Sequence, residues 1–127
     1  MYLIVCGGRT FMDINLAFRT LDKIHKETPI ELILDGGMTG GDRMGREWAK
    51  RRGVKYKTIH ANWKRYGNRA AGPIRNSDML DLLLKLADPG LCNIRVVAFK
   101  GGNGTRDMVR KATAATVDVD CVEWVYE

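Results

Sequence analysis

The chain has 127 residues, 45% of them hydrophobic, and carries a net charge of +6. This length suits one core and is too short for two ordinary domains, so we expect a single domain over residues 1–127. Three cysteines without a CxxC pair or a histidine cluster argue against a disulfide framework and a structural zinc. We expect a cytoplasmic protein, because no basic leader or membrane-length apolar run is present.

Apolar runs alternate with helix-like stretches along the first half of the chain. Residues 2–6 predict a buried strand, and Asp13 is expected to cap a helix that Thr28 and Pro29 stop. Residues 32–34 predict a second strand. Either Thr39 or Asp42 is expected to cap the next helix, which ends at Gly53. Residues 54–59 alternate apolar and polar side chains, a pattern typical of an edge strand.

The second half continues the same alternation after a polar stretch, residues 62–72. Pro73 is expected in the first turn of a third helix, whose buried stripe holds Met79, Leu82, Leu83 and Leu86 and which residues 88–90 end. Strands are expected at residues 96–99 and 117–121, joined by a helix that starts at Thr105. Helical crossovers imply a parallel sheet, and edge positions for the two alternating strands give the order 3-2-1-4-5. We therefore predict a Rossmann-like α/β fold with three layers.

Glycine-rich turns follow three of the expected strands, at residues 6–10, 36–42 and 101–105. Glycine lets the backbone approach a ligand, and the N–H groups at a helix start favour an anion. In the predicted order these turns follow the adjacent strands 2, 1 and 4, where open α/β sheets bind ligands. The pattern therefore predicts a phosphate site.

Two familiar nucleotide motifs are absent from these turns. No Gly-Lys-Ser/Thr follows any of them, and none is the GxGxxG dinucleotide fingerprint after the first strand, which disfavours ATPase and dehydrogenase functions. Asp35, at the end of the second strand, either holds a ribose or caps the adjacent turn. His25 and His60 have no ligand-spaced partner, so no metal site is predicted from them. No cofactor is assigned, and the sequence leaves open whether a divalent metal assists.

Taken together, the motifs resemble the YspA-type branch of the SLOG superfamily, which is related to the LOG phosphoribohydrolases and to the DNA-processing protein DprA. The resemblance runs nearly end to end. Its residues are Gly7-Gly8-Arg9, Asp35-Gly36-Gly37, Gly40-Gly41-Asp42-Arg43, the segments 49–53, 63–67 and 71–79, and Gly101-Gly102-Asn103-Gly104-Thr105.

The resemblance implies a nucleotide or nucleotide-derived ligand, with its phosphate in the turn before Thr105. LOG enzymes cleave the N-glycosidic bond of a nucleoside monophosphate with an arginine, here Arg75, and a glutamate, where this chain has Met108. A thioether cannot orient water or balance positive charge. If the chain is an enzyme, Arg75 acts with another carboxylate, for which Asp42, Asp78 and, more weakly, Asp107 are the candidates.

Side chains near the turns supply the remaining ligand contacts. Arg75 is the first candidate for a phosphate contact, with an ion pair to Asp78 or Asp81 as the alternative. Arg9 is either a ligand contact or a surface charge, and Asn76 is a further ligand candidate. Asp42 and Arg43 either cap the turn and pair with each other or contact ribose. Trp63 and Tyr66 either stack a base or, for Trp63, pack the loop onto the core.

Two functions follow from the sequence. The first is binding of a nucleotide or nucleotide-derived small molecule, with possible hydrolysis of its N-glycosidic bond. The alternative is a DprA-like module for single-stranded nucleic acid, using residues 50–52 and 63–69. A homodimer is also predicted, because the leucines of residues 80–86 exceed what one buried stripe needs.

Overall fold

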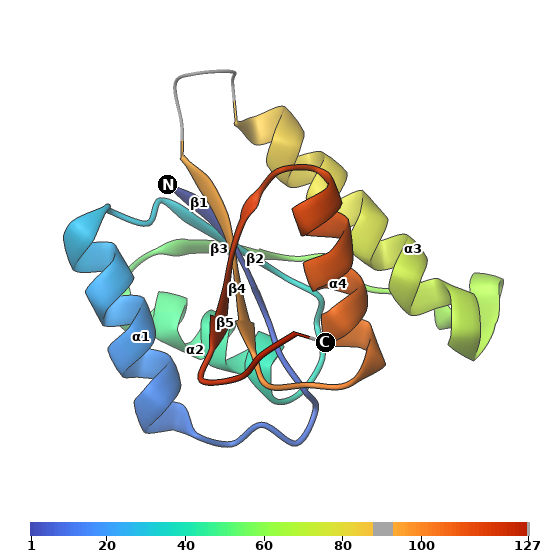
Figure 1. Cartoon of the computed structure of the whole chain (residues 1–127), viewed down its shortest axis with the longest axis horizontal. Coiled ribbons are helices and arrows are strands. Elements are labelled where there is room, and N and C mark those ends of the chain that lie inside the picture. Colours follow the sequence, from blue (N-terminus) through green and yellow to red (C-terminus); the bar gives the residue numbers. More distant parts are fainter. Residues whose placement is uncertain (88–92, 127) are drawn as a thin grey trace.

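The computed structural model describes residues 1–87 and 93–126, which form a parallel sheet in the order β3-β2-β1-β4-β5 (Figure 1). All strand pairs in it are parallel, which confirms the predicted fold class and order. The strands are β1 (Tyr2–Cys6), β2 (Leu32–Asp35), β3 (Lys55–Thr58), β4 (Ile94–Phe99) and β5 (Asp118–Val122). The helices are α1 (Ile14–Glu27), α2 (Gly41–Arg52), α3 (Trp63–Leu86) and α4 (Asn103–Ala114).

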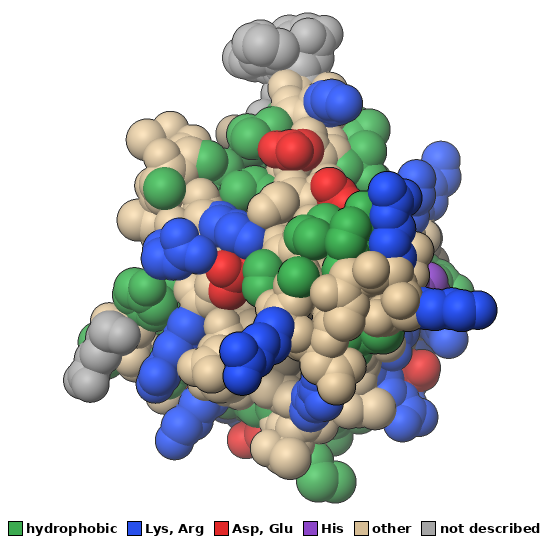
Figure 2. Space-filling model, turned by 90° about the vertical axis from the view of Figure 1, so that its right-hand side faces the viewer, with side chains coloured by type: hydrophobic (Ala, Val, Ile, Leu, Met, Phe, Trp, Pro, Cys, Tyr) green, Lys and Arg blue, Asp and Glu red, His purple; other side chains and the backbone are tan. Residues whose placement is uncertain are grey.

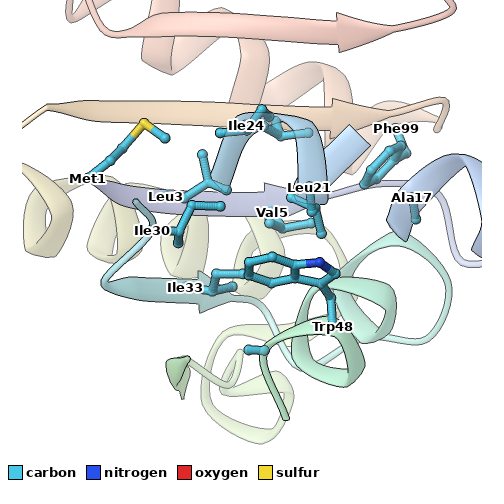
Figure 3. Close-up of a cluster of buried hydrophobic side chains, with 12 residues drawn as sticks. Met1, Leu3, Val5, Ala17, Leu21, Ile24, Ile30, Ile33, Trp48 and Phe99 are labelled. Atoms are coloured by element: carbon cyan, nitrogen blue, oxygen red, sulfur yellow. The ribbon is translucent and has the colours of Figure 1, made fainter. Parts of the chain in front are cut away.

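Two helices cover each face of the sheet. Successive side chains of a strand point to opposite faces, so one strand supplies apolar side chains to both helix layers. Leu3 and Val5 of β1 belong to a buried cluster that includes Trp48 and the inner faces of α1 and α2 (Figure 3). Ile4 of the same strand belongs to a second cluster with Met79 of α3 and with α4. The protein therefore has three layers, with apolar side chains on both sides of the central strands.

The two outer strands carry the more polar sequences. Most side chains of β3 are exposed, including Lys55 and Lys57, and β5 also has exposed aspartates. Lysines at an edge discourage pairing with another chain. The prediction that the alternating strands lie at the edges is confirmed.

Helix α1 begins and ends as its sequence predicts. The Asp13 carboxylate accepts a hydrogen bond from the Leu16 N–H at 3.0 Å, and the chain becomes extended at Thr28. At the end of α2, Gly53 has φ of 68°, the left-handed conformation that a side chain disfavours. These caps explain why local sequence was sufficient to place both helix ends.

The predicted cap of α2 is wrong, because neither Thr39 nor Asp42 caps this helix. Its N-cap is Gly40, which makes no side-chain hydrogen bond and has φ of 75°. A Cβ atom at Gly40 would lie 1.9 Å from the Gly8 carbonyl oxygen, so the approach of two turns requires glycine here. The Asp42 carboxylate bonds instead to the turn that precedes the helix.

The predicted start of α3 is also wrong. The Asn62 side chain accepts a hydrogen bond from the Arg65 N–H at 3.0 Å and starts the helix at Trp63, so the polar stretch is helical. Gly67, with φ of 76° and ψ of 175°, interrupts the helix, and Pro73 lies inside it. The predicted stop at residues 88–90 lies outside the described residues. This early start brings several side chains to the carboxyl edge of the sheet.

The leucines of α3 divide between the core and the surface. Leu80 and Leu83 are buried, whereas Leu84 and Leu86 are 40% and 37% exposed. The prediction of Leu86 in the buried stripe is wrong, since it lies at a hollow beside the amino ends of the strands. The homodimer stays a prediction. Within residues 1–87 and 93–126, no helix has both the length and the apolar character that crossing a bilayer requires.

Candidate functional site

The three glycine turns meet at the carboxyl edge of the sheet, with the turn after β1 in the middle. The Gly8 N–H donates to the Lys100 carbonyl at 3.0 Å, and the Gly8 carbonyl accepts from the Gly41 N–H at 3.1 Å. A Cβ atom at Gly41 would lie 2.4 Å from the Gly7 Cα. Several of these glycines therefore allow the turns to pack against one another.

A cleft of about 550 Å³ opens beside these turns, and it falls within the usual size range of small-molecule sites. Its floor includes Cys6, Gly7 and Gly8 after β1. One wall comes from α3, whose lining residues are Trp63, Asn68, Arg69, Gly72, Pro73, Arg75, Asn76 and Met79. The opposite side is formed by the start of α4, and Arg9, Met38 and Asp42 complete the lining.

The start of α4 presents unused backbone donors to the cleft. No side chain caps this helix, and the Arg106 N–H is the first to bond back, to the Gly102 carbonyl at 3.0 Å. The N–H groups of Asn103, Gly104 and Thr105 precede that bond. Their partial positive charge and the helix dipole favour an anion, as predicted for the turn at residues 101–105.

Thr105 adds a hydroxyl to these backbone donors. Its side chain is only 6% exposed and lines the cleft, yet its hydroxyl makes no hydrogen bond to the described part of the chain. A Cβ atom at Gly101 would lie 2.2 Å from this hydroxyl oxygen, so the glycine makes room for it. Gly101 itself does not line the cleft, whereas Gly102, Asn103 and Gly104 do.

The turn between β2 and α2 is filled by the side chains of the protein. One oxygen of the Asp42 carboxylate, Oδ2, accepts from the Gly36 N–H at 3.0 Å and from the Met38 N–H at 3.4 Å. Asp42 therefore takes the anion's place in this turn. The predicted ligand residues of the turn that do not line the cleft are Asp35, Gly36, Gly37, Gly40, Gly41 and Arg43.

Asp35 is fully buried and uses both carboxylate oxygens within the protein. Oδ1 accepts from the Gly37 N–H at 2.8 Å and from Arg46 at 2.5 Å, and Oδ2 accepts from the Thr58 hydroxyl at 3.0 Å. Of the two alternatives left open by the sequence, this geometry favours the turn cap. The partner Arg46 was missed by sequence reasoning, although its place one helical turn after Asp42 puts it on the same side of α2.

Arg75 lies in the wall of the cleft and is 8% exposed. Its Nη1 donates to the Gly36 carbonyl, and its Nε donates to the Asn76 side-chain oxygen at 3.0 Å. The ion pair to Asp78 or Asp81 considered from sequence does not occur within the described residues. The guanidinium instead faces the turn that Asp42 fills.

The carboxyl group of Asp42 has a strongly shifted pKa. Burial raises the pKa from 3.8 to about 6, the charge of Arg75 opposes this, and the nearby Asp35 adds to the rise. Cys6, on the floor of the cleft, also has a raised thiol pKa, chiefly because it is buried. The thiol is therefore not an activated nucleophile.

Asp107 lines the cleft from the amino-terminal half of α4, although it lies one residue before the glutamate position of the LOG motif. Its carboxylate accepts from the Asn76 amide at 3.0 Å, from Lys111 at 2.9 Å and from Arg110 at 2.8 Å. Burial raises the pKa of Asp107, but the hydrogen bonds from these groups outweigh that effect and lower it. Asp107 is therefore a fixed negative charge whose oxygens are already occupied.

Of the two aromatic candidates, only Trp63 lines the cleft. Its ring lies beside Gly72 of α3, where an added Cβ would be 3.7 Å from the ring atom Cη2. Tyr66 is 39% exposed, does not line the cleft, and stacks with Arg65, whose guanidinium lies 5.2 Å from its ring centre. The interruption at Gly67 separates this aromatic turn from the rest of α3.

The side of the protein that carries α3 and α4 is rich in positive charge. Figure 2, which shows the side carrying α3 and α4, has more Lys and Arg side chains than acidic ones. Arg9 and Arg69 line the cleft, and in the described part of the chain neither forms an ion pair. Among the same residues, no group of three or more His, Cys, Asp or Glu side chains is arranged to hold a metal ion.

Met38, Asn68, Gly72 and Met79 also line the cleft but were not predicted as site residues. Asn62 was the sequence signal that could have revealed the α3 residues among them. As a helix cap it predicts a helix that starts at Trp63, which places residues 68 and 72 one turn apart on one face. Met38 follows no pattern that a sequence reveals.

The chain was compared with models of known protein families. The model of the YspA, cpYpsA-related SLOG family matches residues 1–66, just over half of the chain. The matched part includes the first two glycine turns, Asp42 and Trp63, whereas Arg75 and the start of α4 lie beyond it. No curated protein matches the chain.

Proposed function

Because this chain belongs to the YspA, cpYpsA-related SLOG family, whose membership indicates nucleotide-related binding, we propose that its cleft binds a nucleotide or nucleotide-derived ligand. The phosphate lies at the start of α4. The observation that carries this proposal is the uncapped helix start, where three N–H groups and the buried Thr105 hydroxyl lack partners among the described residues. Asn103 and Gly104 are exposed and the Thr105 hydroxyl is reached from the cleft, so one phosphate there can accept hydrogen bonds from several of these donors at once.

The charges of the cleft support an anionic ligand. Asp42 lies near Arg75, and Asp107 is paired with Lys111 and Arg110, so these carboxylates are largely balanced. Arg9 and Arg69 then add positive charge that no carboxylate in the described part of the chain balances. We assign Arg9 to the phosphate end, since it follows the Gly7-Gly8 turn, and Trp63 to the base, as an aromatic face at the other wall.

The test is isothermal titration of the protein with ribonucleoside monophosphates and with ADP-ribose-like compounds. Thr105→Val keeps the shape of the side chain and removes the hydroxyl, so we expect affinity to fall roughly tenfold, the loss expected for a hydrogen bond to a charged group. Thr113→Val, at an exposed position near the other end of α4, is the matched control. If both variants bind as tightly as the unmodified protein, the phosphate does not bind at this helix start.

Salt dependence separates this proposal from binding of single-stranded nucleic acid. A polymer that contacts several cations loses affinity steeply as salt rises, because counterions are released at each phosphate contact. A mononucleotide held mainly by backbone donors depends on salt far less. A steep slope with an oligonucleotide, together with no mononucleotide binding, would favour the DprA-like alternative.

Hydrolysis of the N-glycosidic bond is a second candidate, favoured by one observation. Asp42 lines the cleft and has one carboxylate oxygen, Oδ1, that no hydrogen bond in the described residues occupies. In such a reaction a carboxylate orients water and takes its proton as the oxygen adds to the anomeric carbon. The C–N bond electrons pass to the base, which leaves and is protonated, so that the proton balance closes. The nearby Arg75 would balance charge on the phosphate or leaving group. Chromatography of the titration mixtures for free base, with Arg75→Ala as the comparison, tests turnover; binding without base release indicates a sensor.

A further inference from the structure

Three buried side chains in the cleft wall each keep one polar group unused. Asp42, Arg75 and Thr105 are 5%, 8% and 6% exposed, and all line the cleft. The protein occupies Oδ2 of Asp42 and Nε and Nη1 of Arg75. In the described part of the chain, Asp42 Oδ1, Arg75 Nη2 and the Thr105 hydroxyl have no hydrogen-bond partner. No fully buried side-chain polar atom lacks a hydrogen-bond partner in that part of the chain, so these three atoms are open to the cleft, where a ligand can bond to them.

The unused atoms differ in what they require. Arg75 Nη2 is a donor and the Thr105 hydroxyl can donate, so both suit phosphate oxygens. An ionised carboxylate only accepts, so the Asp42 Oδ1 requires an O–H or N–H from the ligand. Phosphate alone, which offers acceptors, cannot supply this contact.

The acceptor and the phosphate position lie on either side of the central glycine turn. The backbone beside Gly7 contacts Gly41 at the start of α2, and the backbone beside Gly8 contacts Gly101 before α4. These two segments follow β2 and β4, which flank β1 and lie two strand spacings apart, about 10 Å. A ligand that reaches both has a phosphate at one end and a hydrogen-bond donor some distance from it.

Asp35 cannot take this role. In many dinucleotide-binding folds a carboxylate at the end of the second strand holds the ribose, and Asp35 has that place in this chain. Its two oxygens are already used by Gly37, Arg46 and Thr58, and it does not line the cleft. Asp42 is therefore the buried carboxylate with an oxygen left for a ligand.

We propose, on the basis of the nucleotide-binding function above, that Asp42 determines specificity by accepting a hydrogen bond from a ribose hydroxyl. The cleft then selects phosphorylated ribosides over phosphates that lack the diol. Both features lie on the same edge of the sheet, since Asp42 stands at the start of α2 and the donors for phosphate at the start of α4. The selected ligand class is thus a ribonucleotide or a related ribosyl phosphate.

The test compares each ribonucleoside 5′-monophosphate with its 2′,3′-dideoxy counterpart by isothermal titration. For the unmodified protein we expect the dideoxy compound to bind at least tenfold more weakly, since a site built to bond a hydroxyl leaves its own polar group unpaired without it. Asp42→Asn keeps an oxygen for Gly36 and Met38 and is expected to lower that ratio to below threefold. Asp78→Asn, an exposed carboxylate of α3, is the control and keeps the full ratio.

The outcomes separate this proposal from the function beneath it. Equal affinity for ribo and dideoxy compounds in the unmodified protein overturns the role of Asp42 and leaves phosphate binding intact. If Asp42→Asn keeps the full preference for ribose, another group makes the hydroxyl contact, and the proposed role of Asp42 is overturned as well. If no phosphorylated nucleoside binds, the proposed function itself fails. The comparison in the unmodified protein needs no variant to fold.

Discussion

Asp42 and Arg75 both form hydrogen bonds with the backbone of Gly36, one with its N–H and the other with its carbonyl. The Gly36 N–H donates to the Asp42 carboxylate at 3.0 Å, and the Gly36 carbonyl accepts from the Arg75 guanidinium. Asp42 begins α2 and Arg75 lies within α3, so this contact joins the helices that cover opposite faces of the sheet. The backbone of one glycine thereby fixes two cleft residues.

This arrangement makes Gly36 intolerant of a side chain. A Cβ atom there would lie 2.5 Å from Arg75 Nη1 and 2.8 Å from Asp42 Oδ2, so we expect Gly36→Ala to lower the free energy of unfolding by about 1–3 kcal/mol. Urea denaturation measures this loss. Gly104→Ala is the control, because no atom lies within 4 Å of its added Cβ; an equal loss in both variants would contradict the argument.

Asp42 is expected to make stability depend on pH. Its folded pKa of about 6 lies above its ordinary value of 3.8, so between these pH values the folded state binds the proton and the unfolded state does not. Stability from this group is therefore highest below about pH 4 and falls as pH rises through 6, by about 3 kcal/mol in total. Urea denaturation from pH 4 to 7.5 should show this trend, and Asp42→Asn should lack it. The same slope in both proteins would refute the raised pKa.

Asn76 connects α3 to the start of α4. Its amide nitrogen donates to the Gly104 carbonyl at 3.1 Å and to the Asp107 carboxylate at 3.0 Å. Asn76→Asp replaces that donor with an oxygen and places two carboxylates together, so we expect a loss of about 2 kcal/mol in the free energy of unfolding. Hydrogen exchange should also become faster for the amide of Arg106, the first that bonds back at the start of α4, and for those that follow it in the helix.

The comparison variant for this experiment is Asn15→Asp, an exposed asparagine near the start of α1. It makes the same chemical change without a buried partner, and its stability should stay within about 0.5 kcal/mol of the unmodified protein. If Asn76→Asp is equally mild, Asn76 does not hold the start of α4.

Trp48 depends on Asp22 for its only indole hydrogen bond among the described contacts. The fully buried ring donates from Nε1 to Asp22 Oδ1 at 2.8 Å. Asp22→Ala leaves that N–H without an acceptor, so we expect a loss of about 1–3 kcal/mol in chemical denaturation. Asp22→Asn keeps an oxygen and should cost less; equal losses would point to the Arg52 ion pair instead.

Acid should weaken the same contact in a separate pH range. Hydrogen bonds from Arg52 and then from Trp48 lower the pKa of Asp22 from 3.8 to about 2. A lowered pKa contributes stability above the unfolded value, and this contribution disappears as pH falls from about 4 to 2. Denaturation of Asp22→Asn across this range should show a smaller loss than that of the unmodified protein.

Local patterns were sufficient for most of the fold. The apolar runs of β1, β2 and β4 are buried on both faces and so read as continuous hydrophobic segments, while polar alternation identified the edge strands. Asp13 starts α1 and Gly53 ends α2 through contacts within one turn. The gathering of glycine turns at one edge followed from strand order, because parallel strands end on the same side.

The sequence by itself thus determined the sheet, its order and the edge at which the cleft lies, since hydrophobic periodicity and helix caps act over a few residues. Only the tertiary structure decided which polar groups are consumed by the protein and which remain for a ligand. The sequence offered both Asp35 and Asp42 as ligand residues, yet Arg46 and Thr58 occupy the first, while the second keeps an oxygen without a partner among the described residues. Such pairing depends on contacts between residues distant in the chain, which no local pattern encodes.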